Sequence, residues 1–511
     1  QEFLYTQNVK SMADKILFWI DAVLFHYCLA YYLQKQYQSD LYAVIDITNK
    51  PKNFFKEQKF VNFKKTWFYH DYLQNIDTKP DLDYVSKIEK QYGINLWKLA
   101  INERLFYRFN NFYNFKENEI LSILEKECRF FENILEIKPD FVIGERPQMH
   151  HSQLFYEICK AKGIKFITIV QSRVGYKSIL GHKDNELDSI KTFDEIKPTN
   201  RNFEQLREYI SSHTVSKQLE DYKQKFAASK FEKIKAAGTF LFNFDNPNMD
   251  THYSYFGRSK SRVLLDSINS TLKKSSRQKY INKNLKADFP ASEKFVYFPL
   301  GLDEERNLLI STPFYTNQME TIRHIAKSLP IDYKLYVKEH PSMSIRDWRP
   351  IPEYKELMCI PNVRLFHPSM ETSQFYENCS LVISTGGTSG FEAAFYQKPS
   401  IVFGDVNYSI LSSVHKINSV QELPEAIRLS LTKKVSPEEL DRFLILLEQN
   451  SVDFDWYGFI TKIHDYFYYG GNLVDVEITF DKMKNFLEKN KDSLAKITDA
   501  HIKKIQQYKS N

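Results

Sequence analysis

Blocks of hydrophobic and polar positions along the first part of the chain predict strands that alternate with helices. Short apolar runs predict buried strands, and longer runs with apolar residues at helical spacing predict helices. In chain order these strands and helices are 15–21, 26–36, 41–47, 139–145, 152–163 and 164–172. Strands that alternate with helices of ten or more residues indicate βαβ units and a parallel sheet.

A second alternating series begins near Lys294. It contains strands, helices and a loop with three glycines, and it reads as a complete doubly wound half-sheet. Its segments are 294–300, 317–330, 333–341, 363–368, 373–379, 381–385, the glycine loop 384–390, and 399–405. The region 54–138, rich in Phe, Tyr and Lys, is predicted to be mostly helical and to insert into or cap the first domain.

A chain of 511 residues is too long for one hydrophobic core. We therefore predict an α/β fold of two Rossmann-like doubly wound domains that face a cleft. The predicted parts are an N-terminal acceptor and catalytic domain 12–235, a basic connector 236–290, a C-terminal nucleotide-sugar domain 291–435 and a helical tail 436–511. Residues 1–11 precede Met12 and are expected to be foreign to the native chain.

Composition narrows the class of protein. With 42% hydrophobic and 26% charged residues the chain is that of a folded protein, and its formal charge of +6 is too diffuse to indicate nucleic acid binding. Five scattered cysteines without a CxxC pair indicate reduced thiols of a cytosolic protein. The apolar segment Ile16–Leu33 contains Asp21 and His26, so we interpret it as a buried strand and helix rather than a membrane span. The basic connector is either a solvated helix or a contact for anionic lipid or a charged acceptor.

Two loops of the second domain follow strands that we expect to be neighbours in the sheet, and both loops are suited to an anion. One is Val337 to Pro341, and the other is the glycine loop, where small residues let the backbone approach a ligand and a helix start favours negative charge. Glu392, in the first turn of that helix, is expected to accept hydrogen bonds from ribose hydroxyls. Glycine needed only for the turn and Glu392 as a capping residue are the alternatives. The expected nucleotide-binding residues are Lys338, His340, Ser384, Thr385, Gly386, Gly387, Thr388, Ser389 and Glu392.

Catalytic carboxylates are expected at strand ends of the first domain. The candidates are Asp21, Asp46 and Glu145, and Glu145 has basic residues close by, so that it suits a base or a nucleophile. A charged helix start is the alternative, since Pro147 also suits one. His150 is a further catalytic candidate, and His151 and Arg173 are expected to hold the donor sugar. His150 and His151 have no third ligand at metal-binding spacing, so no metal site is expected.

The segments 297–307, 325–341 and 384–405 resemble the capsular polysaccharide synthesis family. Characterised members of that family are similar to CMP-Kdo-dependent glycosyltransferases of the GT-B fold. The sequence VKEHP also resembles the His-Pro motif of bacterial sialyltransferases, which grips the phosphate of CMP. The resemblance implies phosphate binding by His340 and the loop 384–389, and ribose binding by Glu392. UDP-sugar epimerases and teichoic acid glycerophosphotransferases have similar loops, so the donor stays open.

The resemblance implies a cytoplasmic glycosyltransferase that transfers an ulosonic acid from a CMP-linked donor to a glycan or glycolipid acceptor. Catalysis is assigned to Glu145, Asp21 and His150, and no metal or further cofactor is expected. Peripheral contact with an anionic membrane at its inner face is compatible with the charge. The alternatives are a UDP-sugar-dependent transferase, a non-hydrolysing nucleotide-sugar 2-epimerase, and a non-catalytic nucleotide- or glycan-binding scaffold.

Overall fold

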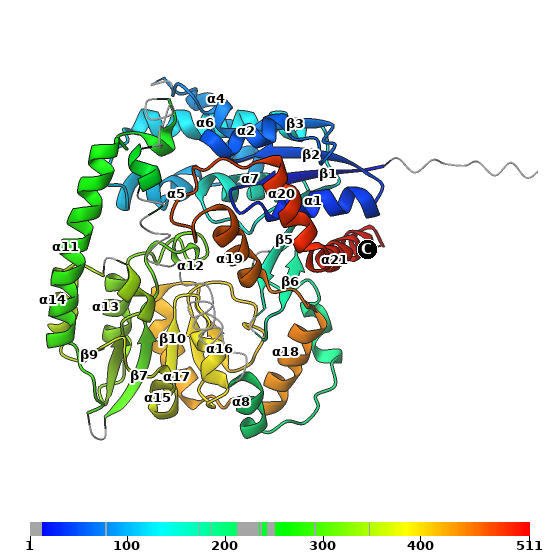
Figure 1. Cartoon of the computed structure of the whole chain (residues 1–511). Coiled ribbons are helices and arrows are strands. Elements are labelled where there is room, and N and C mark those ends of the chain that lie inside the picture. The colour runs from blue at the N-terminus through cyan, green and yellow to red at the C-terminus, as the bar shows by residue number, and fades with distance from the viewer. Residues whose placement is uncertain are drawn as a thin grey trace, which may run out of the picture.

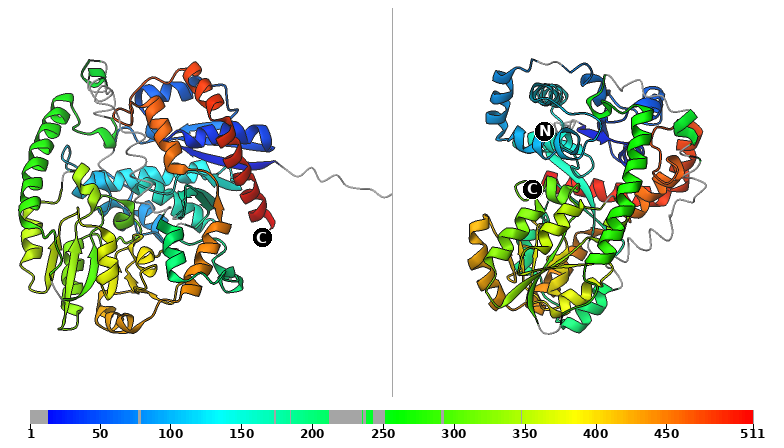
Figure 2. Two further views of the ribbon diagram at one scale, coloured as in Figure 1. Left: turned by 60° about the horizontal axis from the view of Figure 1, so that its bottom comes forward. Right: turned by 90° about the vertical axis from the view of Figure 1, so that its left-hand side faces the viewer.

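The computed structural model contains two β-sheets, one in each half of the molecule, and each sheet is covered by helices on both faces (Figure 1). Seen from the side, the two halves form separate lobes (Figure 2). The residues that the structure describes are 13–76, 79–172, 174–183, 185–211, 235, 238–242, 251–290, 293–346 and 348–510.

The N-terminal sheet has the strand order β13-β6-β5-β4-β1-β2-β3. Its strands are β1 (Asp14–Ile20), β2 (Ser39–Ile45), β3 (Lys65–Phe68), β4 (Phe141–Ile143), β5 (Lys165–Gln171), β6 (Ser178–Gly181) and β13 (Ser451–Val452). The five strands β1 to β5 pair in parallel, whereas β6 and β13 extend the edge in antiparallel pairing. The order 3-2-1-4-5 is the Rossmann order, and it reverses between β1 and β4.

Alternate residues of β1 face two different hydrophobic cores. Ile16 and Phe18 pack in one core, and Leu17 and Trp19 pack in the other, because successive strand side chains point to opposite faces. The helices of this half are α1 (Phe25–Gln36), α2 (Asn49–Glu57), α3 (Tyr69–Tyr72), α4 (Leu82–Tyr92), α5 (Leu96–Ile101), α6 (Glu117–Leu135) and α7 (His150–Ala161). The next helix, α8 (Phe203–Ser211), packs in the other half, where Leu206 shares a core with Phe391 and Phe395 (Figure 1). The buried strand and helix expected for Ile16–Leu33 are confirmed as β1 and α1.

The C-terminal sheet is entirely parallel, with the order β12-β11-β10-β7-β8-β9. Its strands are β7 (Lys294–Pro299), β8 (Tyr333–Lys338), β9 (Val363–Phe366), β10 (Leu381–Ser384), β11 (Ser400–Val402) and β12 (Val414–Lys416). Its helices are α12 (Arg306–Leu309), α13 (Gln318–Ser328), α14 (Ile351–Met358), α15 (Thr372–Asn378), α16 (Ser389–Ala394), α17 (Leu423–Thr432) and α18 (Pro437–Gln449). This is the full six-stranded Rossmann order, and it reverses between β7 and β10.

Together these orders confirm the expected GT-B arrangement of two Rossmann-like domains. Two details differ from the sequence-based expectation. The helical insertion also contributes the edge strand β3, whose four residues are too few for a clear alternation. The two anion-suited loops follow β8 and β10, which were expected to be neighbours but both pair with β7 instead.

The end of the chain returns to the first domain. After α18, the strand β13 joins the N-terminal sheet, and the last helices pack in the same core as α1. These helices are α19 (Trp456–Phe467), α20 (Phe480–Lys489) and α21 (Lys491–Ser510). A long helix, α11 (Lys260–Asn284), runs along the edge of both halves (Figure 1).

The five cysteines fall within the described residues and are all free thiols, four of them buried, as the scattered spacing predicted. Among the helices of the described segments, none has both the length and the apolar character that crossing a membrane requires.

Candidate active site

The carboxyl ends of β1 and β4 bring Asp21 and Glu145 together. In a doubly wound sheet the crevice for ligands lies where the strand order reverses, and β1 and β4 flank that point. The two side chains are hydrogen-bonded to each other and line a cavity of about 180 Å³. Two residues 124 positions apart in sequence thus form one carboxyl pair.

Burial dominates the electrostatics of this pair. It raises the pKa of Asp21, although the hydrogen bond from Glu145 acts in the opposite direction. Burial also raises the pKa of Glu145 well above its usual value, and the nearby Asp21 charge raises it further. Ionising both of two carboxyl groups in contact is opposed by the repulsion between their negative charges. The pair therefore retains a proton, which Glu145 donates to Asp21. Such a pair is suited to proton transfer.

Asp46, at the end of β2, lines the same cavity as a charged carboxylate. Its oxygens lie 2.8 Å from His70 Nε2 and 3.1 Å from His151 Nε2, and Trp19 Nε1 donates to it at 3.3 Å. Burial alone raises the pKa of Asp46, but the two histidines outweigh it and hold this pKa well below its usual range. His151 also lines the cavity, so its ring is available to a ligand there.

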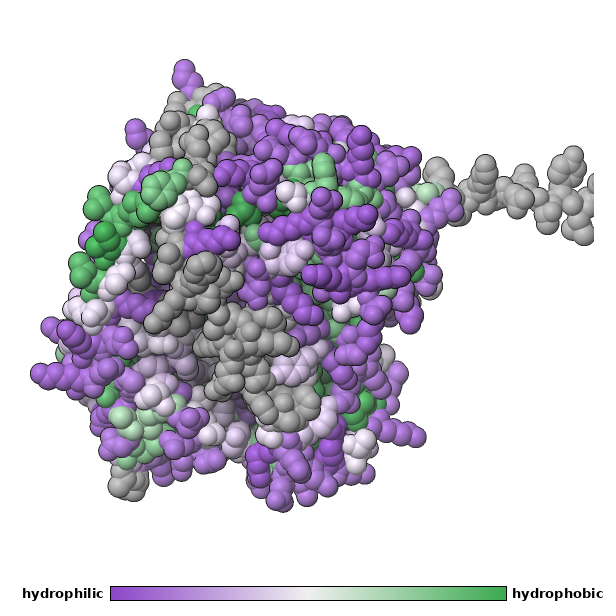
Figure 3. Space-filling view, in the orientation of Figure 1, coloured by the Kyte–Doolittle hydropathy of each residue, from purple (hydrophilic) through white to green (hydrophobic). Residues whose placement is uncertain are grey.

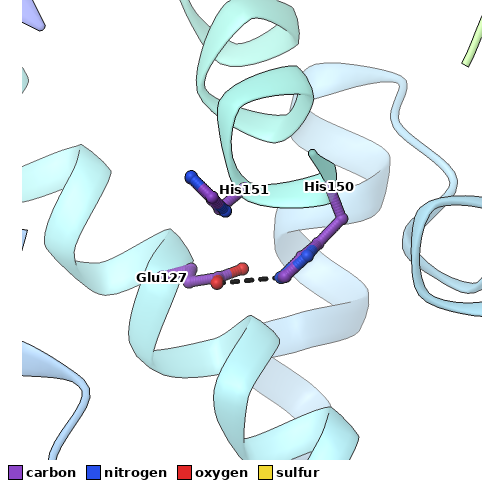
Figure 4. Close-up of side chains that lie close together, drawn as sticks. All are labelled: Glu127, His150 and His151. Atoms are coloured by element: carbon purple, nitrogen blue, oxygen red, sulfur yellow. Dashed lines mark hydrogen bonds and ion pairs between the residues drawn. The ribbon is translucent and has the colours of Figure 1, made fainter. Parts of the chain in front are cut away.

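His150 lies behind the cavity in a buried network of charges. Its Nδ1 is 2.7 Å from Glu103 Oε2. Its Nε2 is 2.9 Å from Glu127 Oε1, the contact drawn in Figure 4. Burial opposes protonation, but Glu127 and Glu103 outweigh it and raise the pKa of His150 to about 10. The histidine is therefore an imidazolium whose two N–H groups are both used. The catalytic role expected of His150 does not fit this position, because the side chain is absent from the cavity lining.

A third possible metal ligand does accompany the two histidines. One ligand atom each of Glu127, His150 and His151 lies within 4.8 Å of the others, and α6 supplies the glutamate that sequence spacing could not reveal (Figure 4). However, both nitrogens of His150 carry protons that are held by carboxylates, so this ring offers no lone pair. We assign this cluster to the support of the cavity wall rather than to a cation.

The glycine loop follows β10 at the switch point of the second sheet. Ser384 Oγ accepts from the N–H of Gly387 at 3.2 Å, and the hydroxyl of Tyr408 donates to the Gly387 carbonyl at 2.5 Å. Glu392 accepts from Thr388 Oγ1 at 2.7 Å and from the Tyr376 hydroxyl at 3.1 Å. Each carboxylate oxygen has a second lone pair, so Glu392 can still accept from a ribose hydroxyl. The following helix α16 has only six residues, so we assign it no anion site of its own.

Lys338 is the last residue of β8, and the loop after it carries Glu339 and His340. Burial lowers the pKa of Lys338 to about 8, and its Nζ donates to Thr372 Oγ1 at 2.7 Å. His340 Nδ1 accepts from the N–H of Ser342 at 3.1 Å, which places the proton of the neutral ring on Nε2. Glu339 is fully buried, 3.1 Å from Arg349 Nε, and accepts the N–H of His340 at 2.7 Å. Glu339 therefore fixes the loop from inside, a role that the sequence motif did not indicate.

The two domains meet at a cavity of about 80 Å³ that includes Gly386 and Gly387 on one side and Arg146 on the other. Arg146 also lines the cavity of the carboxyl pair, so one side chain links the two. A wider hollow of about 790 Å³ between the domains shares Lys183, Asn185 and Val406 with the smaller one. Its size is that of a small-molecule site.

Arg306 was not predicted as a site residue, although it lies in the segment 297–307 that carries part of the family resemblance. It comes from α12 of the second domain, and its Nε donates to the carbonyl of Pro147 in the first domain at 2.6 Å. It is buried, and its charge opposes the rise of the Glu145 pKa. Arg104 makes the reciprocal contact, donating to the Glu304 carbonyl at 2.5 Å. The signal in the sequence was an arginine six residues after the predicted strand 294–300.

The structure thus brings together Asp21, Asp46, Glu145 and His151 in one cavity. It places the loop 384–389 with Glu392, and Lys338 with His340, after strands on either side of β7. Arg173 lies outside the described residues. The roles of these residues in binding and catalysis stay predictions.

A pair of glycine substitutions tests the packing of the loop. A Cβ at Gly390 would lie 2.8 Å from Ser400 Oγ and 3.0 Å from the Tyr408 hydroxyl, whereas one at Gly387 meets only Ser384 Oγ at 3.6 Å. We expect Gly390→Ala to lower the free energy of unfolding by about 1–3 kcal/mol. Gly387→Ala, the matched control, should change it by less than about 0.5 kcal/mol. Denaturant titration measures both, and equal effects would contradict the packing described.

Comparisons with known proteins agree with the sequence motifs. Residues 200–421 match the family model described as capsule polysaccharide biosynthesis protein, which confirms the resemblance over less than half of the chain. No curated protein matches the chain significantly.

Solved structures are similar only at low identity. UDP-GlcNAc 2-epimerase from Methanocaldococcus jannaschii has 13% identity and a TM-score of 0.24, covering 85% of this chain and 99% of that one. The β-Kdo 2,7 transferase of KpsC from Thermosulfurimonas dismutans has 13% identity and a TM-score of 0.26, covering 70% and 97%. Its β-Kdo 2,4 transferase has 9% identity and a TM-score of 0.27, covering 60% and 78%. Likeness at this level identifies neither a donor nor a reaction.

Proposed function

We propose that this protein is a glycosyltransferase of surface polysaccharide synthesis, because residues 200–421 match the family model described as capsule polysaccharide biosynthesis protein. Its donor is a CMP-linked ulosonic acid, and its acceptor is a glycan or glycolipid. It works in the cytoplasm, at the inner face of the membrane. The observation that carries the proposal is the carboxyl pair Asp21–Glu145 at the switch point of one sheet, with a phosphate-suited loop at the switch point of the other.

In the proposed reaction, an acceptor hydroxyl attacks the anomeric carbon of the donor sugar. The bond from that carbon to the phosphate oxygen breaks, and CMP leaves with the bonding electrons. The carboxyl pair takes the proton of the attacking hydroxyl, because it sits in a cavity large enough for part of a sugar ring. In the proposal, Arg146 balances the carboxylate of an ulosonic acid, and His151, which also lines the cavity, contacts the donor sugar.

The leaving nucleotide is assigned to the second domain. Backbone N–H groups of the loop 384–389 other than that of Gly387, which donates to Ser384 Oγ, are donors for its phosphate. The Nε2–H of His340 is a further donor, and Glu392 accepts from the ribose. Lys338 is a buried cation near Glu392, so it offsets that carboxylate as well as the phosphate. Fixed donors of this kind stabilise negative charge that develops on a leaving group, which removes the need for a bound metal in the proposal.

Two substitutions test the nucleotide site. We expect His340→Ala and Glu392→Ala each to weaken binding of CMP by about 10- to 100-fold, because each removes a hydrogen bond that involves a charged group. Isothermal titration calorimetry with CMP measures this, and transfer should fall with binding. Glu377→Ala, an exposed glutamate on α15, is the matched control. Unchanged CMP binding by both variants would contradict the assignment.

A thermal-shift screen with CMP, CDP, UDP and GDP separates the donor classes, since a ligand that binds the folded state raises its stability in proportion to RT ln(1 + [L]/Kd). An increase in melting temperature with UDP alone would show that the donor is linked to UDP and not to CMP. Turnover of a UDP-N-acetylhexosamine without acceptor would identify an epimerase. Tight nucleotide binding with no hydrolysis or transfer by any acceptor would identify a non-catalytic scaffold.

A further inference from the structure

The helix α11 connects the two domains and contacts both. Near its start, Asp266 accepts from the side chain of Asn111 in the first domain at 3.3 Å. Further along, Arg277 Nη1 donates to the Trp348 carbonyl of the second domain at 2.7 Å, and Ile281 is fully buried in that domain's core. The helix is therefore held at fixed points in both domains.

The opposite face of α11 exposes a stripe of large aliphatic side chains. Leu264, Leu265, Ile268 and Leu272 are 38%, 60%, 58% and 65% exposed. At 100° per residue these four positions fall within one arc of about 100°, pointing away from the side that carries Ile281. In Figure 3 hydrophobic colour gathers over the upper part of α11. We call these four residues the α11 stripe. An apolar patch of this kind on a polar surface marks a contact site.

Positive charge surrounds the stripe. The helix has seven lysines and arginines and one acid, a formal charge of +6 that equals the net charge of the whole chain. Lys279 and Lys283 are exposed and continue the outward face beyond the stripe, and exposed Lys260 and Lys273 flank it. Apolar side chains bordered by lysines are the pattern of helices that lie in the interface of an anionic bilayer.

We propose that α11 docks on the surface of a membrane that contains anionic lipid. The α11 stripe enters the boundary between headgroups and acyl chains, and the lysines contact lipid phosphates. A second copy of this chain fits the surface less well, because a two-fold contact would set one helix of charge +6 against another. Since α11 is anchored to both domains, docking holds the cleft at a fixed position above the bilayer. This inference does not depend on the proposed donor or reaction.

Vesicle flotation with the full chain tests the proposal. We expect binding to vesicles with 30% phosphatidylglycerol in phosphatidylcholine, at least tenfold weaker binding to phosphatidylcholine alone, and weakening by 0.5 M NaCl. The triple variant Leu265→Gln, Ile268→Gln, Leu272→Gln should lose at least tenfold in vesicle affinity while keeping its melting temperature. Ile331→Gln and Phe314→Gln, which remove apolar side chains that are 99% and 80% exposed elsewhere, are the matched controls.

Three outcomes would overturn the proposal. They are equal binding to both vesicle types, unchanged binding of the triple variant, and a wild-type dimer in sedimentation equilibrium that the triple variant dissolves. The last result would assign the α11 stripe to a contact between copies of the chain. Nucleotide binding by the triple variant should equal that of the wild type, so that failure of docking and failure of the nucleotide site are told apart.

Discussion

Glu145→Gln is expected to lower kcat/KM for sugar transfer by about 10²- to 10⁴-fold, the usual contribution of general acid–base catalysis. The amide of Gln reproduces the donor that protonated Glu145 offers to Asp21, but it cannot give up or take a proton. Asp21→Asn should have a similar effect, because the two carboxyl groups are hydrogen-bonded and titrate as a pair. Steady-state transfer assays measure the loss.

The same substitution is expected to maintain or raise the stability of the folded state, although it lowers the rate of transfer. The pKa values of Asp21 and Glu145 are raised in the folded state from 3.8 and 4.5, so above about pH 4 the folded chain binds more protons than the unfolded one. The free energy of unfolding therefore falls as pH rises through the raised values. Glu145→Gln removes the part of that fall that comes from Glu145, and its melting temperature at pH 8 should equal or exceed that of the wild type.

Loss of transfer with retained or increased stability separates a catalytic carboxyl from a structural one. Glu136→Gln, an exposed glutamate in the same domain, is the matched control and should alter neither property. Wild-type transfer by Glu145→Gln would exclude the carboxyl pair from catalysis. A melting temperature that falls with activity would instead assign the pair to folding.

His150→Gln is expected to lower the free energy of unfolding by about 3–5 kcal/mol, the usual effect of removing one partner of a buried ion pair. The change leaves Glu103 and Glu127 buried without their cation. Both carboxylates lie deep in the protein, so water cannot replace the lost interaction. Denaturant titration measures the loss, and His324→Gln on the half-exposed surface of α13 should remain within about 0.5 kcal/mol of the wild type.

The pH dependence distinguishes this ion pair from ordinary packing. The pKa of His150 is raised from 6.5 to about 10, so its stabilising contribution is complete below pH 6.5 and is lost as pH rises towards 10. The pKa of Glu103 is lowered to about 2, so its contribution is present above 4.5 and is lost as pH falls towards 2. The deficit of His150→Gln should shrink between pH 6.5 and 10, and a constant deficit would contradict a charged His150.

The sequence predicted most of the fold because the two-residue and 3.6-residue periods are local properties. The strands near 15–21 and 381–385 and the helices near 26–36 and 152–163 were recognisable without knowing any partner. The prediction was wrong where the hydrophobic pattern was short. Strand β3 has only four residues and was assigned to a helical region. The prediction that β8 and β10 are neighbours was also wrong, because β7 lies between them and strand order is decided by long-range pairing.

The candidate active site was likewise predicted only in part. Asp21, Asp46 and Glu145 were predicted from their places at strand ends, since parallel strands end at one edge of a sheet. No local pattern indicated that Asp21 and Glu145 share a proton, or that His150 is held by Glu103 and Glu127. These properties depend on burial and on residues that are distant in sequence. Arg306 was missed because its contact with Pro147 crosses from one domain to the other.

The sequence by itself therefore determined the two βα domains, the strand ends that carry polar residues and the glycine loop with its family resemblance. Only the tertiary structure decided which of those polar residues meet, which are charged and which face a cavity. The physical reason is that hydrophobic periodicity follows from neighbours along the chain. Protonation and cavity shape follow from desolvation and from charges that the fold brings within a few ångströms.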